Sequence, residues 1–429
     1  MTTAAEHPAI EPGRAPRDLV ACAPRLIRAS IENLAGITPD GVERAELIDG
    51  IAELEAAIAT AQAAQAAWIR TFARAEAAHQ LERGGLTEPE KIQRTIAAQV
   101  GLACRVSPTE GRTRVRVARD LHDGLDHVRA LSHAGELSAQ KIRAIASEVS
   151  HLDPAERSEV DRLLHTQGVT GRDGRGVGKL RDLTRRLAAQ VAPGKFRARC
   201  AAARTGRRVT LRPAADGMTD LTAHLSAEQG AACLAALHKA FTKVSIDPAP
   251  LTRSRGQVMA DTLVERLTGQ ATANDVNVDV QIVVPIEALI DPDSPLPAEI
   301  PGCGPVPADL ITTTTGRKVW RRLLTAAGIV IGGDSRRRHF SGFLAELVRA
   351  RDRWRCTEAY CDAPAREIDH IIRAADGGPT DFDHGRGACQ FHNLLRELPD
   401  WTVERVDEGV LTTTPTGHTH LYRLPRPNL

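Results

Sequence analysis

Two short pairs of metal-binding residues, far apart in the sequence, constrain how the end of this chain can fold. Cys356 and Cys361 form a C-x4-C pair, and Cys389 and His392 form a C-x2-H pair after a gap of 27 residues. Each pair fits one tight turn, and a tetrahedral zinc ion would join the two turns. Three thiolates and one imidazole leave no open position, so we predict a structural ion. A disulfide and unrelated buried cysteines are the alternatives. The other five cysteines show no pairing pattern and are expected to be small core residues.

A second polar set lies in the same stretch and consists of Asp369, His370, His384 and Asn393. Carboxylate and amide oxygens suit Mg²⁺ or a similar ion, and a neutral imidazole can take a proton from water. Such a set could activate water and hold a phosphate oxygen on the metal. An Asp-His pair alone is more often structural. Its place between the two halves of the zinc signature is what favours a chemical role.

The composition is that of a globular protein with two or more domains. Of its 429 residues, 42% are hydrophobic, 26% are charged and only 3% are aromatic, so the core must rest on Ala, Leu, Val and Ile. No stretch of about 18 apolar residues predicts a membrane span, and the first residues lack the apolar core of a signal peptide. We therefore expect no membrane partner and a cytoplasmic location, where disulfides rarely persist.

The predicted fold class is mainly α with a small β-sheet in the N-terminal domain (α+β), followed by a zinc-stapled C-terminal domain. We divide the chain into a flexible tail (1–24), a helix-rich domain (25–335) and a C-terminal domain (336–429). Four apolar residues at helical spacing predict one long amphipathic helix over residues 42–78. They are Leu47, Ile51, Leu54 and Ile58.

Local signals place further elements in the helix-rich domain. Ser107, Asp153 and Ser226 each stand three residues before Glu or Gln, which is typical of a capped helix start. Further helices are expected over residues 89–104, 138–150 and 256–267. Alternating apolar residues predict strands over 207–213 and 276–285, with a turn and a third strand over 216–225. Two segments rich in glycine or proline, 165–182 and 291–310, are expected to be loops.

The C-terminal domain follows a basic stretch. Residues 317–366 contain twelve basic and five acidic residues, which suits a phosphate-binding surface or, equally, a solvated helix face. A helix is expected over residues 341–354, with arginines partly outward, and a strand over 366–373. Residues 401–406 and 410–414 are expected to form a terminal hairpin.

These motifs resemble a known family. The order C-x4-C, "IDHIIRAADGGPTDFDH", C-x2-H and then "TPTG" is similar to the zinc-containing HNH (ββα-metal) endonucleases. In particular, the chain resembles actinobacterial proteins that join an HNH domain to a long N-terminal domain of unknown function, number 222. Segments such as "ALSHAGELSAQKIRAIA" and "VMADTLVERLTG" carry the resemblance into the N-terminal domain. It covers most of the chain after the tail.

The resemblance implies a role for each residue of the second polar set. His370 matches the general base that deprotonates water, and Asp369 matches the acid that binds the catalytic metal. Asn393 stands where the family usually has a histidine that is the second metal ligand. His384 stands where an asparagine usually braces the loop that orients the base. The "GRGA" segment after His384 also departs from the family, which prefers apolar residues there. These departures bear on activity more than on fold.

The implied function is hydrolysis of DNA phosphodiester bonds with Mg²⁺ or Mn²⁺ at Asp369 and Asn393, supported by a structural Zn²⁺. DNA phosphates are expected to contact five arginines, Arg336, Arg337, Arg338, Arg351 and Arg373. One alternative is a catalytically degenerate, zinc-stapled domain that only binds nucleic acid. Another is a structural or interaction protein with the helical domain as scaffold. The sequence predicts no oligomeric state.

Overall fold

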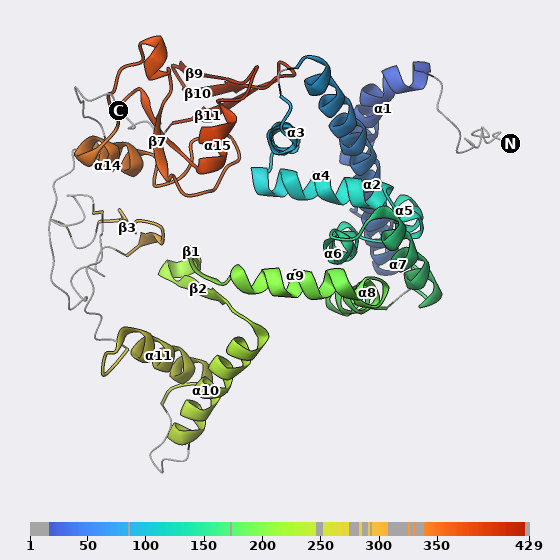
Figure 1. Cartoon of the computed structure of the whole chain (residues 1–429), viewed down its shortest axis with the longest axis horizontal. Coiled ribbons are helices and arrows are strands. Elements are labelled where there is room, and N and C mark those ends of the chain that lie inside the picture. The colour runs from blue at the N-terminus through green and yellow to red at the C-terminus, as the bar shows by residue number, and fades with distance from the viewer. Residues whose placement is uncertain are drawn as a thin grey trace. The chain divides into compact units, whose positions relative to one another are not determined.

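The computed structural model describes most of the chain (Figure 1). The described residues are 17–84, 86–171, 174–245, 252–273, 283–284, 291, 294–307, 325–326, 329–330 and 339–424. Contacts divide the chain into two units, Met1–Ile58 and Ala59–Leu429. Three sequence expectations lie wholly or mostly outside the described residues. They are the tail, the strand over 276–285, and the DNA-contacting residues Arg336, Arg337 and Arg338.

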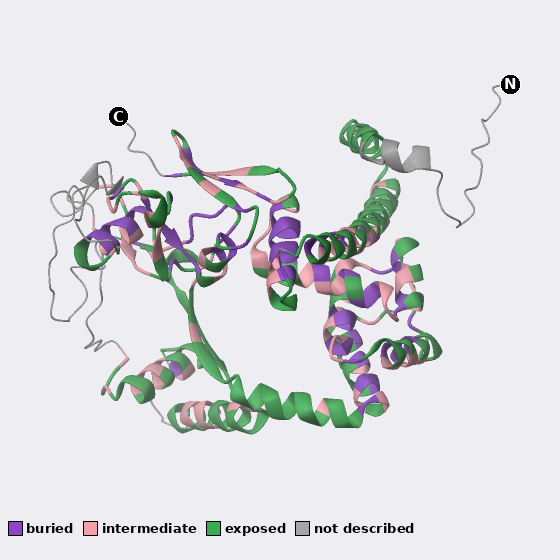
Figure 2. Ribbon diagram, turned by 45° about the horizontal axis from the view of Figure 1, so that its top comes forward, coloured by how far each residue is buried: buried purple, intermediate pink, exposed green. Residues whose placement is uncertain are grey.

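The first unit consists of helix α1, Arg17–Ala35, and the start of helix α2, Arg44–Glu82. Helix α2 confirms the long helix expected over 42–78. Its apolar stripe, however, does not face a core, because Ile51 is 62% exposed and Ile58 is 51% exposed. Among the described side chains of residues 25–58, none is buried. Figure 2 accordingly colours almost all of this part green.

The second unit contains a group of helices packed around an aliphatic core. Leu121, Ile145 and Leu164 are each at most 1% exposed, and the buried residues of this core include no aromatic side chain. The low aromatic content of the sequence predicted such an aliphatic core. No helix in the described ranges is long and apolar enough to cross a membrane. The helices that contribute to this core include α4 Pro108–His122, α5 Asp126–His133, α6 Ala139–Val149, α7 Pro154–Thr166 and α8 Val177–Val191. Helix α3, Pro89–Ala103, precedes them in the chain, and α9, Pro193–Thr205, follows them.

The predicted helix starts are confirmed by their hydrogen bonds. The Ser107 side chain accepts from the backbone N–H of Glu110 at 3.3 Å at the start of α4. Asp153 and Glu156 form a reciprocal capping box at the start of α7. Each bond satisfies an N–H group that has no partner within its helix.

The strands after α9 form small antiparallel hairpins. β1, Arg208–Pro213, pairs with β2, Thr219–His224, as the alternation predicted. Helices α10, Ala227–Ser245, and α11, Arg255–Thr268, follow. Further short pairs are β3 Ala298–Ile300 with β4 Gly304–Val306, and β5 Thr325–Ala326 with β6 Ile329–Val330.

Two of the expected loops are shorter than predicted. Helix α8 begins at Val177, inside the segment 165–182, and the β3–β4 hairpin lies inside 291–310. Glycine and proline marked the turns correctly, but they hid the short regular elements between those turns.

The C-terminal domain has a β-hairpin followed by a short helix. Helix α14, Gly342–Arg351, precedes strand β7, Glu367–His370, which pairs with β8, Gly385–Ala388. Helix α15, Gln390–Leu395, follows directly and completes a ββα unit (Figure 1). The expected terminal hairpin is β9, Thr402–Val406, with β10, Gly409–Thr413, and a third strand that was not predicted, β11, Thr419–Arg423, extends it.

The N-terminal helices and the C-terminal domain share one hydrophobic cluster. Ile96 on α3 belongs to the same cluster as Leu395 and Leu398 at the end of α15. The indole Nε1 of Trp401, just before β9, donates a hydrogen bond of 2.8 Å to the Thr95 hydroxyl. Because both side chains are buried, this bond joins segments 306 residues apart in a dry environment. The division at residues 335 and 336 stays a prediction.

This bond should be measurable as an energetic coupling. We expect Thr95→Val and Trp401→Phe each to lower the free energy of unfolding by about 1–3 kcal/mol, because each leaves one buried polar group without its partner. Urea unfolding of the full chain, followed by circular dichroism, should give a coupling energy of about 0.5–1.5 kcal/mol between them. Ile145→Val, in the aliphatic core of the N-terminal helices, is the control. Its effect on the free energy of unfolding should add to that of Trp401→Phe. Additivity of the Thr95 and Trp401 substitutions would contradict the shared cluster.

Candidate functional site

The zinc-ligand set predicted from the sequence comes together at the start of the ββα unit. The backbone N–H of Cys361 donates to the Glu358 carbonyl at 3.1 Å, which closes a tight turn between Cys356 and Cys361. Cys389 is the N-cap of α15, and His392 lies in its first turn. The sequence spacing therefore produces the two turns that it predicted.

The geometry of the four ligand atoms fits tetrahedral zinc. The Sγ atoms of Cys356 and Cys389 each lie 3.4 Å from Nδ1 of His392, and the Sγ atoms of Cys361 and Cys389 are 3.9 Å apart. Zinc bonds of about 2.3 Å to sulfur and 2.0 Å to nitrogen give tetrahedral edges of about 3.8 and 3.5 Å. All four ligand atoms lie within 4.8 Å of one another, and all four residues are buried.

The pKa values of the ligand side chains reflect strong interactions among them. Burial favours the neutral imidazole, yet the contacts with Cys356 and Cys389 raise the pKa of His392 to about 10. The neighbouring sulfur atoms raise the pKa of Cys361 and lower that of Cys389. A zinc ion needs thiolates and a neutral imidazole, so its binding would release protons from this cluster.

Two residues of the second polar set, Asp369 and His370, lie on opposite faces of strand β7. Asp369 pairs with Arg386 and His370 with Gly385 across the hairpin. Glu367 and Asp369 share one face, since side chains alternate along a strand. The amide Nδ2 of Asn393, on α15, donates to Glu367. The face that carries Asp369 therefore lies toward α15, whereas His370 occupies the other face.

Two buried arginines bind the Asp369 carboxylate. Arg386 reaches Oδ2 of Asp369 at 3.4 Å and Oε2 of Glu358 at 3.0 Å, and Arg396 donates to the same Oδ2 of Asp369. Burial opposes a charge on Arg386, but Glu358 and Asp369 raise its pKa. Arg386 belongs to the unusual "GRGA" segment, and no local sequence pattern indicated its role or the roles of Arg396 and Glu358.

Other side chains hold both residues that were expected to bind a divalent ion, Asp369 and Asn393. An ion bound to the Asp369 carboxylate would have to share it with the guanidinium groups of Arg386 and Arg396. The Asn393 amide points its donor at Glu367. The two expected ligands are thus engaged by separate partners.

The candidate base His370 is held on the opposite face. Its Nε2 atom lies 2.9 Å from the Thr380 hydroxyl, and its ring centroid is 4.6 Å from that of Phe340. These contacts fix the imidazole orientation from two sides. Thr380 is a further residue of the site that the sequence analysis did not single out.

His384 braces the loop between β7 and β8. Its ring Nδ1 lies 2.7 Å from Oδ1 of Asp381, and its backbone N–H donates to the same oxygen at 2.8 Å. Burial opposes ionisation of Asp381, but the bonds from His384 lower its pKa. The carbonyl of His384 accepts from the backbone N–H of Ile371 at 2.8 Å. The residue therefore ties the loop to the chain directly after His370.

The arginine expectations had different outcomes. Arg351 is only 5% exposed, and its guanidinium donates to the Asp352 carboxylate and to the carbonyls of Phe382 and Gly385. Its expected contact with DNA is therefore wrong, because these bonds hold it inside the domain. Arg373 is exposed, with 44% of its side chain accessible, and stays a candidate for phosphate contact.

Comparison with known proteins identifies the N-terminal part. Residues 48–290, more than half of the chain, match the family described as Domain of unknown function (DUF222). The chain belongs to the DUF222 family. No curated protein matches the chain, and no solved structure matches it. The DUF222 match ends before Cys356, so the metal cluster and the ββα unit lie outside it.

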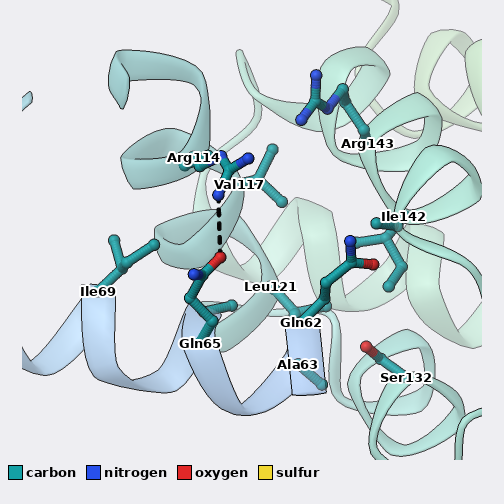
Figure 3. Close-up of a pocket in the computed structure, with 12 residues that line it drawn as sticks. Gln62, Ala63, Gln65, Ile69, Arg114, Val117, Leu121, Ser132, Ile142 and Arg143 are labelled. Atoms are coloured by element: carbon teal, nitrogen blue, oxygen red, sulfur yellow. Dashed lines mark hydrogen bonds between the residues drawn. The ribbon is translucent and has the colours of Figure 1, made fainter. Parts of the chain in front are cut away.

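The DUF222 region contains a pocket of about 90 Å³ between α2, α4, α5 and α6 (Figure 3). Ser132 is fully buried and its hydroxyl, which points into the pocket, has no hydrogen-bond partner. Arg114 donates to Gln65 at 3.1 Å, and Arg143 binds Glu110. The pocket thus offers a mostly apolar wall with one available hydroxyl, and it brings together no acid–base or nucleophilic set.

Metal analysis of the purified full-length DUF222 protein tests the ligand set. We expect about one zinc ion per chain, and we expect Cys361→Ser to lose it, because only three ligands would remain. The C-terminal domain should then become sensitive to protease while most of the helical circular dichroism signal persists.

The matched control is Cys233→Ser. Cys233 and Cys200 are exposed, so the expectation that these two cysteines fill a core was wrong, and neither belongs to the ligand cluster. Cys233→Ser should retain the full zinc content. An unchanged zinc content in Cys361→Ser would contradict the assignment of this ligand.

Proposed function

We propose that the C-terminal domain is an HNH-type nuclease domain that hydrolyses DNA. The observation that carries the proposal is the buried Cys₃His cluster at the ends of a β-hairpin and a short helix, with His370 at the end of β7. This order of elements and ligands is the one that the sequence resemblance implied. The DUF222 match is compatible with it, since the same resemblance joined the two parts.

In the proposed reaction, His370 acts as general base. Its neutral imidazole takes a proton from water as the water oxygen bonds to phosphorus, one P–O ester bond breaks, and the departing sugar oxygen takes a proton from solvent. Thr380 orients the imidazole ring of His370. His384 fixes the loop between β7 and β8, which contains Thr380. The exposed Arg373 supplies a positive charge for a DNA phosphate. Because Arg386 and Arg396 already bind the Asp369 carboxylate, no step is assigned to a divalent ion.

The contacts of Asp369 favour a second candidate function, binding of nucleic acid without cleavage. Buried ion pairs with Arg386 and Arg396 give the carboxylate a structural role in the place where the resemblance implies a metal ligand. A zinc-stapled domain with that change would keep its fold and the exposed Arg373. Activity measurements separate the two candidates.

Nicking of supercoiled plasmid DNA tests the nuclease proposal. We expect the full-length protein to nick the plasmid, and we expect His370→Ala to lower the rate by about 10²–10⁴-fold, the usual contribution of a general base. Parallel reactions with Mg²⁺, with Mn²⁺ and with a chelator show whether a divalent ion takes part.

His79→Ala is the matched control, because His79 is exposed on α2 and has no part in the proposed site. It should nick at the parent rate. Equal rates for His370→Ala and the parent would remove His370 as the base. If the zinc-loaded parent nicks the plasmid under none of the three conditions, that result would select the binding function.

The salt dependence of DNA binding tests the phosphate contact. We expect Arg373→Ala to weaken binding to duplexes of different sequence to a similar degree. It should also reduce the slope of log K against log salt concentration by about 0.9, which corresponds to one phosphate contact. Arg162→Ala on α7, where the side chain is 62% exposed, is the control and should leave the slope unchanged. Equal slopes for Arg373→Ala and the parent would exclude this contact.

A further inference from the structure

The first unit presents two amphipathic helices without a core. Ten large apolar side chains of residues 26–58 are exposed by 39–68%, and none of the described side chains of residues 25–58 is buried. A segment of this size seldom folds alone without oligomerisation or another staple. The ten are Leu26, Ile27, Ile31, Leu34, Ile37, Val42, Ile48, Ile51, Leu54 and Ile58.

The exposed side chains follow the spacing of a helix–helix seam. On α1, Ile27, Ile31 and Leu34 are separated by four and three residues. On α2, Ile51 is followed by Leu54 and Ile58 at spacings of three and four. Alternating three- and four-residue steps keep apolar side chains on the stripe that faces a partner helix in a coiled coil. The pattern therefore suits a helix as the covering element.

The two helices of one copy leave both stripes uncovered. Ile31 is 60% exposed and Ile51 is 62% exposed, so α1 and the start of α2 do not bury each other. We infer that this surface binds a second copy of the chain, so that α1 and the start of α2 from two copies form an antiparallel four-helix bundle. This inference is independent of the nuclease proposal.

The charges beside the stripes support a second copy as the occupant. Residues 25–35 of α1 carry two arginines, Arg25 and Arg28, and a single acid. Residues 44–58 of α2 carry one arginine and four acids, Glu46, Asp49, Glu53 and Glu55. In a two-fold symmetric pair, α1 of each copy can lie against α2 of the other, so both contacts bring opposite charges together.

The size of the surface also matches a dimer. At roughly 100 Å² for each of the ten side chains, covering them would remove on the order of 1,000 Å² per copy, compared with about 800 Å² per partner in a typical stable interface. The area is too large for isolated surface residues, which need no partner.

The mass of the full-length protein in solution tests the inference. By light scattering after size exclusion, the parent should have twice the chain mass at micromolar concentration. The double substitution Ile31→Glu and Ile51→Glu places a charge in each seam and should raise the dimer dissociation constant by about 100-fold or more. The zinc content of the variant should equal that of the parent, because the four zinc ligands are unchanged.

The matched control adds the same charges off the seam. Asn33→Glu and Ala52→Glu change exposed residues of the same two helices and should leave the dimer intact. A monomeric parent, or an unchanged dimer in the Ile31 and Ile51 variant, would overturn the inference. If the monomeric parent bound phosphatidylcholine–phosphatidylserine vesicles through these residues, a lipid surface would be the occupant instead.

Discussion

A buried tetrahedron of three sulfur atoms and one imidazole nitrogen joins two turns that are 27 residues apart. The segment between the turns contains β7, β8 and the loop that connects them, and the second turn begins α15. Asp369, His370 and His384 all lie inside this closed segment. A structural zinc ion in a small peptide contributes about 10–16 kcal/mol of folding free energy. One ion would thus fix the whole candidate site.

The C-terminal domain also buries several ion pairs. Arg351 and Asp352 are both buried, and the Asp352 carboxylate also accepts from the backbone N–H of Gly387 on β8. Burial raises the pKa of Asp352. Arg386 is 1% exposed between Glu358 and Asp369. Such pairs are weak sources of stability, but loss of one partner is costly because the other charge remains buried and unpaired. Arg351 therefore faces inward, where it pairs with the buried Asp352. Asp369 likewise has a structural role in addition to any chemical one, because it pairs with the buried Arg386.

The sequence predicted the parts of the structure that depend on local spacing. The two pairs of zinc ligands and the helix caps at Ser107 and Asp153 were found because the residues within each pair or cap are only a few positions apart. The partners of Asp369 were not found, since Arg386 and Arg396 lie 17 and 27 residues away and only the fold brings them together. Periodicity identified the apolar stripe of α2 correctly. It could not show what covers that stripe, because a stripe that faces a core and one that faces a second chain have the same spacing.

X-ray absorption at the zinc edge of the full-length protein tests the central claim most directly. The account predicts one zinc site with three sulfur neighbours at about 2.3 Å and one nitrogen neighbour at about 2.0 Å. A first shell made of oxygen and nitrogen, or one with fewer than three sulfur atoms, would show that Cys356, Cys361, Cys389 and His392 do not bind the ion together. The two turns would then lack the link on which the site depends.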